Sequence, residues 1–268
     1  MRSEYLIPEG GQQPDAAFYE SIFSMLCDIV RPLPVTIRLL DIAADKPVPW
    51  VKPVTGMMGT LGLQGARLYD REPIQSVFHA MLDAIAALVN RNQLSLIIPY
   101  IVHLEEFRHW RREIEQRLNA PLPIGVMAET PAAILAMQDW FEDADFVSIG
   151  CNDLMQCLFA ADRDLPELSA HLDPYAPVLF RFLRQAAEAA GENLGKVQLC
   201  GLLPQMPGVL PMLLGMGYSA FSVEPMMIPY LAKITTETNL SQVQVLVDEI
   251  CAAKESREVR ELLGLTFV

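Results

Sequence analysis

The chain has 268 residues, of which 51% are hydrophobic and 20% are charged, and its net charge at pH 7 is −13. This length allows one large domain or two small ones, and a single domain of this size buries about three quarters of its unfolded surface. The acidic balance, with no run of Lys or Arg, argues against a nucleic acid or an anionic membrane surface as the partner.

Short apolar runs that end in polar or small residues recur along the chain and predict β-strands. They cover residues 35–41, 94–99, 124–128, 145–150, 197–200 and 220–223, with a further edge strand at 2–7. Near-continuous apolar runs of this length are typical of parallel strands that are buried on both faces.

Helical patterns lie between most of these runs. The spacing of apolar residues predicts helices at 76–90, 107–118, 131–141, 178–190 and 208–216. We expect Pro207 to open the helix at 208–216. A C-terminal helical segment at 241–263 is expected from its dense i,i+4 charges.

The alternation of strands and helices leaves two architectures, a (β/α)₈ barrel and an open doubly wound sheet. No GxGxxG or Walker loop opens a helix, which weakens the nucleotide-binding version of the open sheet. Polar residues follow the strands, as they do at the active-site rim of a barrel. We therefore predict an α/β fold of the (β/α)₈ TIM-barrel type. Fewer than eight strands are visible, so we expect a fragment or an incomplete barrel.

The cysteines and the apolar stretches bear on location. The five cysteines form no CxxC pair, which favours a reducing cytoplasm over a disulfide framework or a structural zinc site. No apolar h-region follows Met1, so we expect no signal peptide. Prolines and glutamines interrupt the uncharged stretch 197–223, so we expect no membrane span there.

Two carboxylates, Glu129 and Asp153, each come directly after an apolar strand. Hard oxygen ligands from neighbouring strand ends can hold Mg²⁺ and leave coordination positions open for substrate oxygens. The alternative is that each carboxylate caps the helix that follows it, since acidic side chains are favourable at helix N-termini.

Four arginines, Arg2, Arg38, Arg67 and Arg163, lie next to strand ends or turns rather than on helix faces. Guanidinium groups bind phosphate and carboxylate through two parallel hydrogen bonds, so these residues are candidates for an anion site. Each could equally form a salt bridge with one of the 33 acidic residues.

Cys200 ends a predicted strand and precedes Gly201. A thiol at this position could donate a proton or act as a nucleophile. The alternative is a cysteine that only packs in the core.

Eight short motifs occur in order along the chain. They are RSEYL (2–6), RLLDIAADK (38–46), LGLQGAR (61–67), VMAETPAA (126–133), SIGCNDLMQ (148–156), AADR (160–163), LCG (199–201) and LGMG (214–217). Together they closely resemble the C-terminal phosphoenolpyruvate-binding domain of enzyme I of the bacterial sugar phosphotransferase system, a phosphoenolpyruvate-protein phosphotransferase. Pyruvate phosphate dikinase and phosphoenolpyruvate synthase share this domain.

The resemblance implies a barrel of the phosphoenolpyruvate/pyruvate type that dimerises and binds phosphoenolpyruvate with Mg²⁺ at the carboxyl ends of its strands. Glu129 and Asp153 match the metal-binding carboxylates, and Cys200 matches the cysteine that protonates the enolate carbon to release pyruvate. The matches to substrate-binding positions are Arg2, Arg38, Arg67, Asn152 and Arg163. Arginines and a metal would spread the charge of the transferring phosphoryl group.

Some positions depart from the family pattern. Gln64 stands where the motif LGxRGxR has its first arginine, so one positive charge is missing. Leu202 stands where a Glu usually follows Cys-Gly, and residues 203–207 replace a more polar loop. The segment 41–45 lacks the usual paired glycines. The loss of one charge-assisted contact typically costs about 1–3 kcal/mol, so weakened or altered substrate binding is expected.

The resemblance also implies what the chain lacks. Residues 1–268 are expected to form a single barrel domain without its first strand, as the C-terminal fragment of a longer protein. The domain that carries the phosphorylatable histidine is absent. Implied partners are phosphoenolpyruvate, that phosphohistidine domain, a downstream phosphocarrier protein and a second copy of the chain.

Several functions stay open at this point. The first is the catalytic domain of such a phosphotransferase, in which phosphoenolpyruvate supplies the phosphoryl group and pyruvate is released. The second is a non-catalytic module that senses phosphoenolpyruvate, which Gln64 and Leu202 favour. The third is a dimerisation platform with a vestigial pocket. A lyase or aldolase of the same barrel superfamily would share the fold, but the ordered motifs argue against it.

Overall fold

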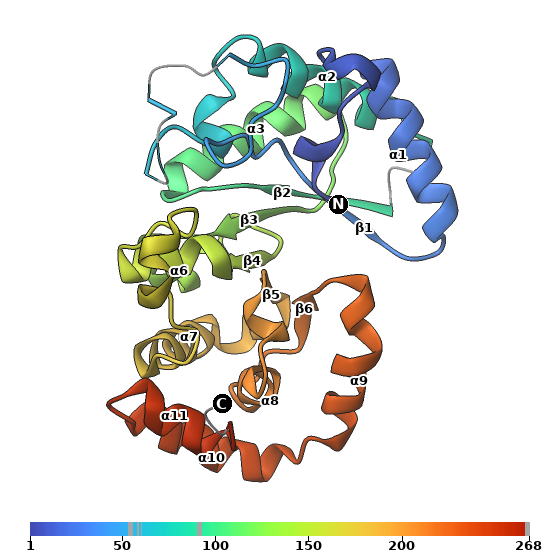
Figure 1. The fold of residues 1–268 in the computed structure, drawn as a ribbon. Helices are drawn as coiled ribbons and strands as arrows, with labels where there is room; N and C mark the ends of the chain where they lie inside the picture. Colours follow the sequence, from blue (N-terminus) through green and yellow to red (C-terminus); the bar gives the residue numbers. More distant parts are fainter. Residues whose placement is uncertain (53–55, 58, 60, 90–92, 266–268) are drawn as a thin grey trace. The chain divides into compact units, whose positions relative to one another are not determined.

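The fold is known from a computed structural model, which describes residues 1–52, 56–57, 59, 61–89 and 93–265 (Figure 1). The chain divides into two compact units. One comprises Met1–Ala128 and Glu142–Phe146, and the other comprises Glu129–Phe141 and Val147–Val268.

The first unit is built on three parallel strands, β1 (Val35–Arg38), β2 (Leu94–Ile98) and β3 (Ile124–Ala128), with β2 in the middle. Its helices are α1 (Ala16–Val30), α2 (Ile74–Ala87) and α3 (Leu104–Leu118). In this unit α2 packs between α1 and α3 (Figure 1). All five residues of β3 are buried, as its unbroken apolar run predicts.

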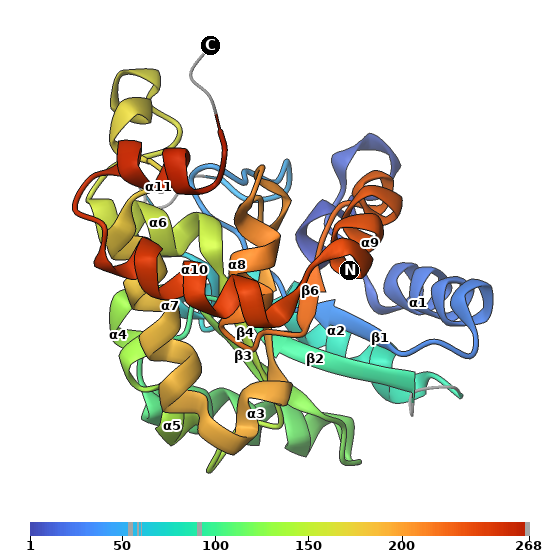
Figure 2. The ribbon, with the colours of Figure 1, turned by 90° about the horizontal axis from the view of Figure 1, so that it is seen from below.

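The second unit repeats this arrangement with β4 (Val147–Gly150), β5 (Val197–Cys200) and β6 (Ala220–Ser222), again parallel and with the middle strand flanked by the other two. Its helices are α4 (Pro131–Leu135), α5 (Met137–Trp140), α6 (Cys151–Phe159), α7 (Pro177–Ala190), α8 (Val209–Gly215), α9 (Ile228–Glu237), α10 (Leu240–Ala252) and α11 (Ser256–Leu262). Helix α10 packs against both α7 and α8 (Figure 2).

The core of each unit combines apolar packing with a few satisfied polar groups. In the first unit the rings of Tyr69 and Phe78 stack with centroids 4.2 Å apart, and Trp110 meets both edge-on. In the second unit the buried Trp140 donates its indole N–H to the Ala133 carbonyl at 2.7 Å. Buried aromatic side chains with a polar end usually find such a partner, because an unpaired buried donor is costly.

The sequence predictions of the α/β class, of parallel strands and of the six runs as strands are confirmed, with β1, β2, β4 and β6 shorter than predicted. Helices are present in all the predicted segments, but 131–141 is divided into α4 and α5 at Ala136. Helix α2 ends at Ala87, before the predicted end of the 76–90 segment, and residue 90 lies outside the described residues. Helix α3 buries the predicted stripe of Phe107, Trp110, Ile114 and Leu118.

Three further local predictions were wrong. Residues 2–7 form no strand: Arg2 makes one isolated bridge to Arg38, and Ser3–Tyr5 turn into a short 3₁₀-helix. The segment 241–263 is two helices, because the backbone becomes extended at Ala253. Pro207 does not open α8, because Gly208 lies between them with a left-handed φ of 76° and the helix begins at Val209.

No helix in the described part of the chain combines the length and the apolar character that crossing a membrane requires.

The packing of β3 gives a test of the fold. A Cβ added at Gly125 would lie 2.5 Å from the Phe146 ring, so we expect Gly125→Ala to lower the free energy of unfolding by about 1–3 kcal/mol. Gly195→Ala is the control, because no atom lies within 4 Å of a Cβ there. Urea unfolding measures both variants. Equal midpoints for the two would contradict the packing.

Candidate functional site

The second unit gathers polar side chains at the carboxyl ends of its strands. Glu129 is buried, and its carboxylate packs on Gly150 so closely that a Cβ there would lie 2.4 Å from Glu129 Oε1. Gly150 ends β4 and pairs with Cys200 at the end of β5. Glu129, the end of β4 and Cys200 therefore form one row.

Helix capping does not account for Glu129. The cap of α4 is the next residue, Thr130, whose hydroxyl accepts a hydrogen bond from the Ala133 amide at 3.3 Å. Of the two sequence interpretations, the capping one is therefore wrong for Glu129. Glu129 is buried at the end of β3, and ligand binding is the role that we test below.

Asp153 lies in the first turn of α6 and belongs to a closed set of contacts. Its Oδ1 accepts a hydrogen bond from Gln156 Nε2 at 3.0 Å, and its Oδ2 lies 3.4 Å from an Arg163 guanidinium nitrogen. Gln156 in turn accepts a hydrogen bond from the Arg163 backbone amide at 2.9 Å. Gln156 thus holds both the Asp153 carboxylate and the backbone of Arg163 in place.

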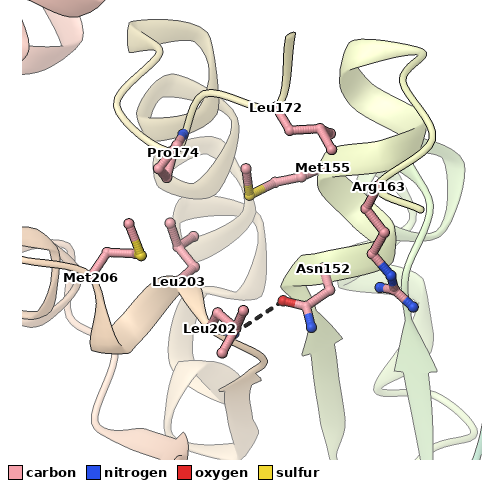
Figure 3. Close-up of a pocket in the computed structure, with 8 residues that line it drawn as sticks. All are labelled: Asn152, Met155, Arg163, Leu172, Pro174, Leu202, Leu203 and Met206. Atoms are coloured by element: carbon pink, nitrogen blue, oxygen red, sulfur yellow. Dashed lines mark hydrogen bonds between the residues drawn. The ribbon is translucent and has the colours of Figure 1, made fainter. Parts of the chain in front are cut away.

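Asn152 connects the start of α6 to the turn after β5. Its Oδ1 accepts a hydrogen bond from the Leu202 amide at 3.0 Å (Figure 3). The approach is so close that a Cβ on Gly201 would lie 2.6 Å from this oxygen, and Gly201 also has a φ of 100°. Glycine is required there on both grounds.

Cys200 is partly exposed and accepts a hydrogen bond from the Ser148 hydroxyl at 3.6 Å. Ser148 itself is fully buried in β4. A hydroxyl that donates to sulfur stabilises a thiolate more than a thiol, so this contact supports loss of a proton from Cys200. The neighbouring Cys151 is different, because burial raises the pKa of its thiol well above the usual value.

A pocket of about 280 Å³ opens beside these residues (Figure 3). Its polar lining comes from Asn152 and Arg163. The apolar lining comes from Met155, Leu172, Pro174, Leu202, Leu203 and Met206. Sequence reasoning did not anticipate an apolar wall next to the anion-binding candidates.

The arginine candidates Arg2, Arg38 and Arg67 belong to the first unit. Arg38 ends β1, is buried, and forms ion pairs with Glu4 and, at 3.0 Å, with Asp41. Lys46 reaches the same Asp41 oxygen at 2.5 Å. Arg38 therefore forms salt bridges in this structure, which the sequence left open as the alternative to anion binding.

Burial and nearby charges have opposing effects on the pKa of Glu4 in its buried pair with Arg38. Burial raises the pKa of the Glu4 carboxyl above its usual value, Arg38 acts to lower it, and the nearby Asp41 raises it again. The net direction is upward, because desolvation is the largest cause.

Gln64 directly precedes the 3₁₀-helix Gly65–Leu68, and Arg67 lies within it. Gln64 is buried, whereas Arg67 is exposed and lies over the Tyr100 ring at 5.1 Å. Gly65 bonds to the Ile42 carbonyl, and a Cβ there would lie 3.4 Å from Asp41 Oδ1. This segment therefore adjoins the Asp41 that pairs with Arg38.

Arg2 is also exposed, and it is connected to Arg38 through an isolated backbone bridge.

Three residues of these sites were missed by sequence reasoning: Glu4, Ser148 and Gln156. The i,i+3 spacing of Asp153 and Gln156 on a helix was an available signal, since such side chains are neighbours. Nothing in the sequence connects Ser148 with Cys200, or Glu4 with Arg38, because each contact depends on the pairing of separate segments.

The donor set of the second unit fits Mg²⁺. Glu129 and Asp153 supply hard oxygen ligands, and the close fit of Glu129 over Gly150 brings its carboxylate to the strand end that leads into α6. No group of three or more His, Cys, Asp or Glu ligands occurs among the described residues. One or two carboxylates plus substrate oxygens are the usual ligand set for Mg²⁺ in phosphoryl-transfer sites.

Parallel strands with polar residues at their carboxyl ends place the chain among α/β proteins, a class in which small ligands bind at that edge of the sheet. Comparison with known proteins gives the family. Residues 1–240 match the model of the phosphoenolpyruvate-binding domain of phosphoenolpyruvate-utilising enzymes, and the chain belongs to this family.

Individual relatives agree with this assignment. The chain is 32% identical over 267 residues to a multiphosphoryl transfer protein of Xanthomonas campestris, and 28% identical over 274 residues to multiphosphoryl transfer protein 2 of Escherichia coli. It is 28% identical over 274 residues to a phosphoenolpyruvate-protein phosphotransferase of Buchnera aphidicola. Each match covers 98% of this chain, but only 32%, 33% and 48% of the respective relative.

The exposure of the cysteines predicts their order of alkylation. Cys157 and Cys200 are partly exposed, whereas Cys27, Cys151 and Cys251 are buried and burial raises their pKa. We expect iodoacetamide at pH 7.5 to label the first two at least tenfold faster, as followed by peptide mass spectrometry. Labelling in urea, where all five should react alike, is the control. A Cys200 as slow as Cys151 would exclude it as an accessible acid.

The raised pKa of Glu4 predicts a pH effect on stability. Between pH 4.5, the usual value, and the higher folded-state pKa, the folded chain binds the proton more tightly than the unfolded chain. Stability from this group is therefore present at low pH and is lost as pH rises through that window. The measured quantity is the difference in free energy of unfolding between the wild type and Glu4→Gln. This difference should fall as pH rises. Glu20→Gln, at an exposed position of α1, should give a flat difference.

Proposed function

We propose that this chain is the catalytic phosphoenolpyruvate-binding domain of a phosphoenolpyruvate-protein phosphotransferase. The observation that carries the proposal is the row from Glu129 across Gly150 to Cys200, with Asn152 bonded to the turn that follows Cys200. An anion-binding amide, a carboxylate and a candidate acid are thus joined within one unit. The names of the relatives support phosphoenolpyruvate as the substrate.

Substrate binding is assigned first to Asn152 and Arg163. The Asn152 oxygen is turned to Leu202, so its NH₂ group is left to donate to a phosphate oxygen. Arg163 presents a guanidinium, whose planar N–H groups suit a phosphate or carboxylate group, and it lies 3.4 Å from Asp153 Oδ2. Both residues contribute donors, which suits a phosphoryl group whose charge must be stabilised in transfer.

Glu129 and Asp153 would hold Mg²⁺. The metal would supply positive charge that neutralises the phosphoryl and enolate oxygens. Gln156 orients Asp153 for this role, and the close packing on Gly150 orients Glu129.

Cys200 is assigned the proton transfer. As the P–O bond of phosphoenolpyruvate breaks and an N–P bond forms to a histidine of another domain, the enolate of pyruvate remains. Its C3 then takes the thiol proton of Cys200, which yields pyruvate and a thiolate that water reprotonates. The Ser148 hydroxyl stabilises that thiolate through its hydrogen bond to the sulfur.

The proposal extends to the whole protein. Residues 1–268 would form one TIM-barrel domain that lacks a first strand, with Arg2, Arg38 and Arg67 at the same substrate. A phosphohistidine domain, a phosphocarrier protein and a second copy would be its partners, in the reducing cytoplasm that the five free cysteines suit. The chain's coverage of a third to a half of its relatives leaves room for such a domain elsewhere in the protein.

Calorimetric titration with phosphoenolpyruvate tests the site. We expect binding that requires Mg²⁺ and that weakens at least tenfold in Glu129→Gln, because a metal ligand is lost. Glu142→Gln is the matched control, since this side chain is 73% exposed and belongs to the other unit. The absence of heat at millimolar phosphoenolpyruvate with Mg²⁺ would contradict the proposal.

A second candidate is a module that binds phosphoenolpyruvate without turnover. It is favoured by the state of Arg38, whose guanidinium pairs with two carboxylates, and by Gln64 at a position that carries arginine in the family pattern. An anion that uses Arg38 must then compete with Glu4 and Asp41.

Exchange of the pyruvate methyl protons with D₂O separates the two functions. The catalytic domain should exchange them by the reverse of its last step, in a reaction that needs Mg²⁺ and is lost in Cys200→Ala. Cys157→Ala should keep the exchange rate, because this cysteine has no assigned role. Binding of phosphoenolpyruvate with exchange no faster than in buffer would establish the sensing module instead.

A further inference from the structure

The pocket beside Asn152 and Arg163 has more apolar wall than phosphoenolpyruvate needs. Six of its eight lining residues are apolar, and the volume of about 280 Å³ lies near the lower end of the range for small-molecule sites. The apolar part of phosphoenolpyruvate is a single methylene group. Mostly apolar walls with a few converging polar groups are the usual profile of a ligand site.

The polar groups gather at one end of this pocket. In Figure 3 the Arg163 guanidinium and the Asn152 amide lie on the same side, and Leu172, Pro174 and Met155 lie at the opposite end. The Leu202 backbone N–H donates to the side-chain oxygen of Asn152, so the Asn152 NH₂ group can donate to a ligand. This end of the pocket therefore favours an anion.

The apolar wall comes from three separate segments. Met155 projects from α6, Leu172 and Pro174 come from the segment before α7, and Leu203 and Met206 come from the turn after β5. Leu203 is almost fully buried and therefore holds its part of the wall in place. Methionine side chains adapt to different ligand shapes, so this wall can take either an aliphatic chain or a flat ring.

We infer that this pocket binds an amphiphilic anion, which is a small molecule with a phosphate or carboxylate group and an aliphatic or aromatic body. The anionic group binds Asn152 and Arg163, and the body packs on Met155, Leu203 and Met206. This inference rests on the proposed function only in that both use Asn152 and Arg163. Because they share this pair, the amphiphilic anion competes with phosphoenolpyruvate.

A series of n-alkyl phosphates, from methyl to hexyl phosphate, tests the inference by calorimetry on the full chain. Each methylene that enters the pocket should raise the affinity about fourfold, until the wall is covered. The longer members should also displace phosphoenolpyruvate. Arg163→Gln should weaken the whole series alike.

Leu202→Glu probes the wall without disturbing the core, because Leu202 lines the pocket and is 56% exposed. We expect it to reduce the affinity ratio of butyl to methyl phosphate at least fivefold. The matched control is Leu240→Glu at the start of α10, where the leucine is 53% exposed and a carboxylate suits the helix N-terminus. The control should keep the ratio of the wild type.

Other outcomes have definite meanings. Equal affinity for methyl and butyl phosphate would overturn the inference, and so would Mg²⁺-dependent binding of phosphoenolpyruvate with no binding of any alkyl phosphate. Neither result would contradict the proposed function. Chain-length dependence that Leu202→Glu removes, found without any binding of phosphoenolpyruvate, would support the pocket and refute the proposed function.

Discussion

The hydrogen bond from the Leu202 amide to the Asn152 side chain fixes the end of β5 against the start of α6, within the second unit. It closes over Gly201, where a side chain would collide with the Asn152 oxygen. Cys200 comes just before this turn in the chain, and three of the apolar residues of the pocket, Leu202, Leu203 and Met206, come just after it. The position of the candidate acid and the shape of the pocket therefore both depend on one amide and one glycine.

The first unit contains a cluster of buried charged side chains. Arg38 pairs with Glu4 and Asp41, and Lys46 pairs with Asp41, so these four groups carry no net charge when all are ionised. Pairing offsets part of the large desolvation penalty, and it makes each group dependent on its partners. An anion that approached Arg38 would disturb this balance, so its binding energy would depend on the protonation of Glu4.

The sequence predicted the parts of this structure that depend on local pattern. Period and composition are enough to locate strands such as β3 and the buried stripe of α3. They did not show the break at Ala253 or the Gly208 turn before α8.

The candidate site was predictable only where each residue sits at a strand end. Glu129, Asp153 and Cys200 were identified in that way, and the motif resemblance added Asn152. Ser148 and the apolar pocket were not found, because they arise from the β4–β5 register and from a turn whose residues look like ordinary core. Such contacts are specified by tertiary pairing, which a single sequence does not display.

The two units are interleaved along the chain. Residues 129–141 belong to the second unit, 142–146 return to the first, and the chain passes back to the second at Val147. No single cut in the chain therefore separates the residues of one unit from those of the other. Residues 1–240, which match one family model, are thus expected to be inherited as an indivisible cassette when longer proteins are assembled.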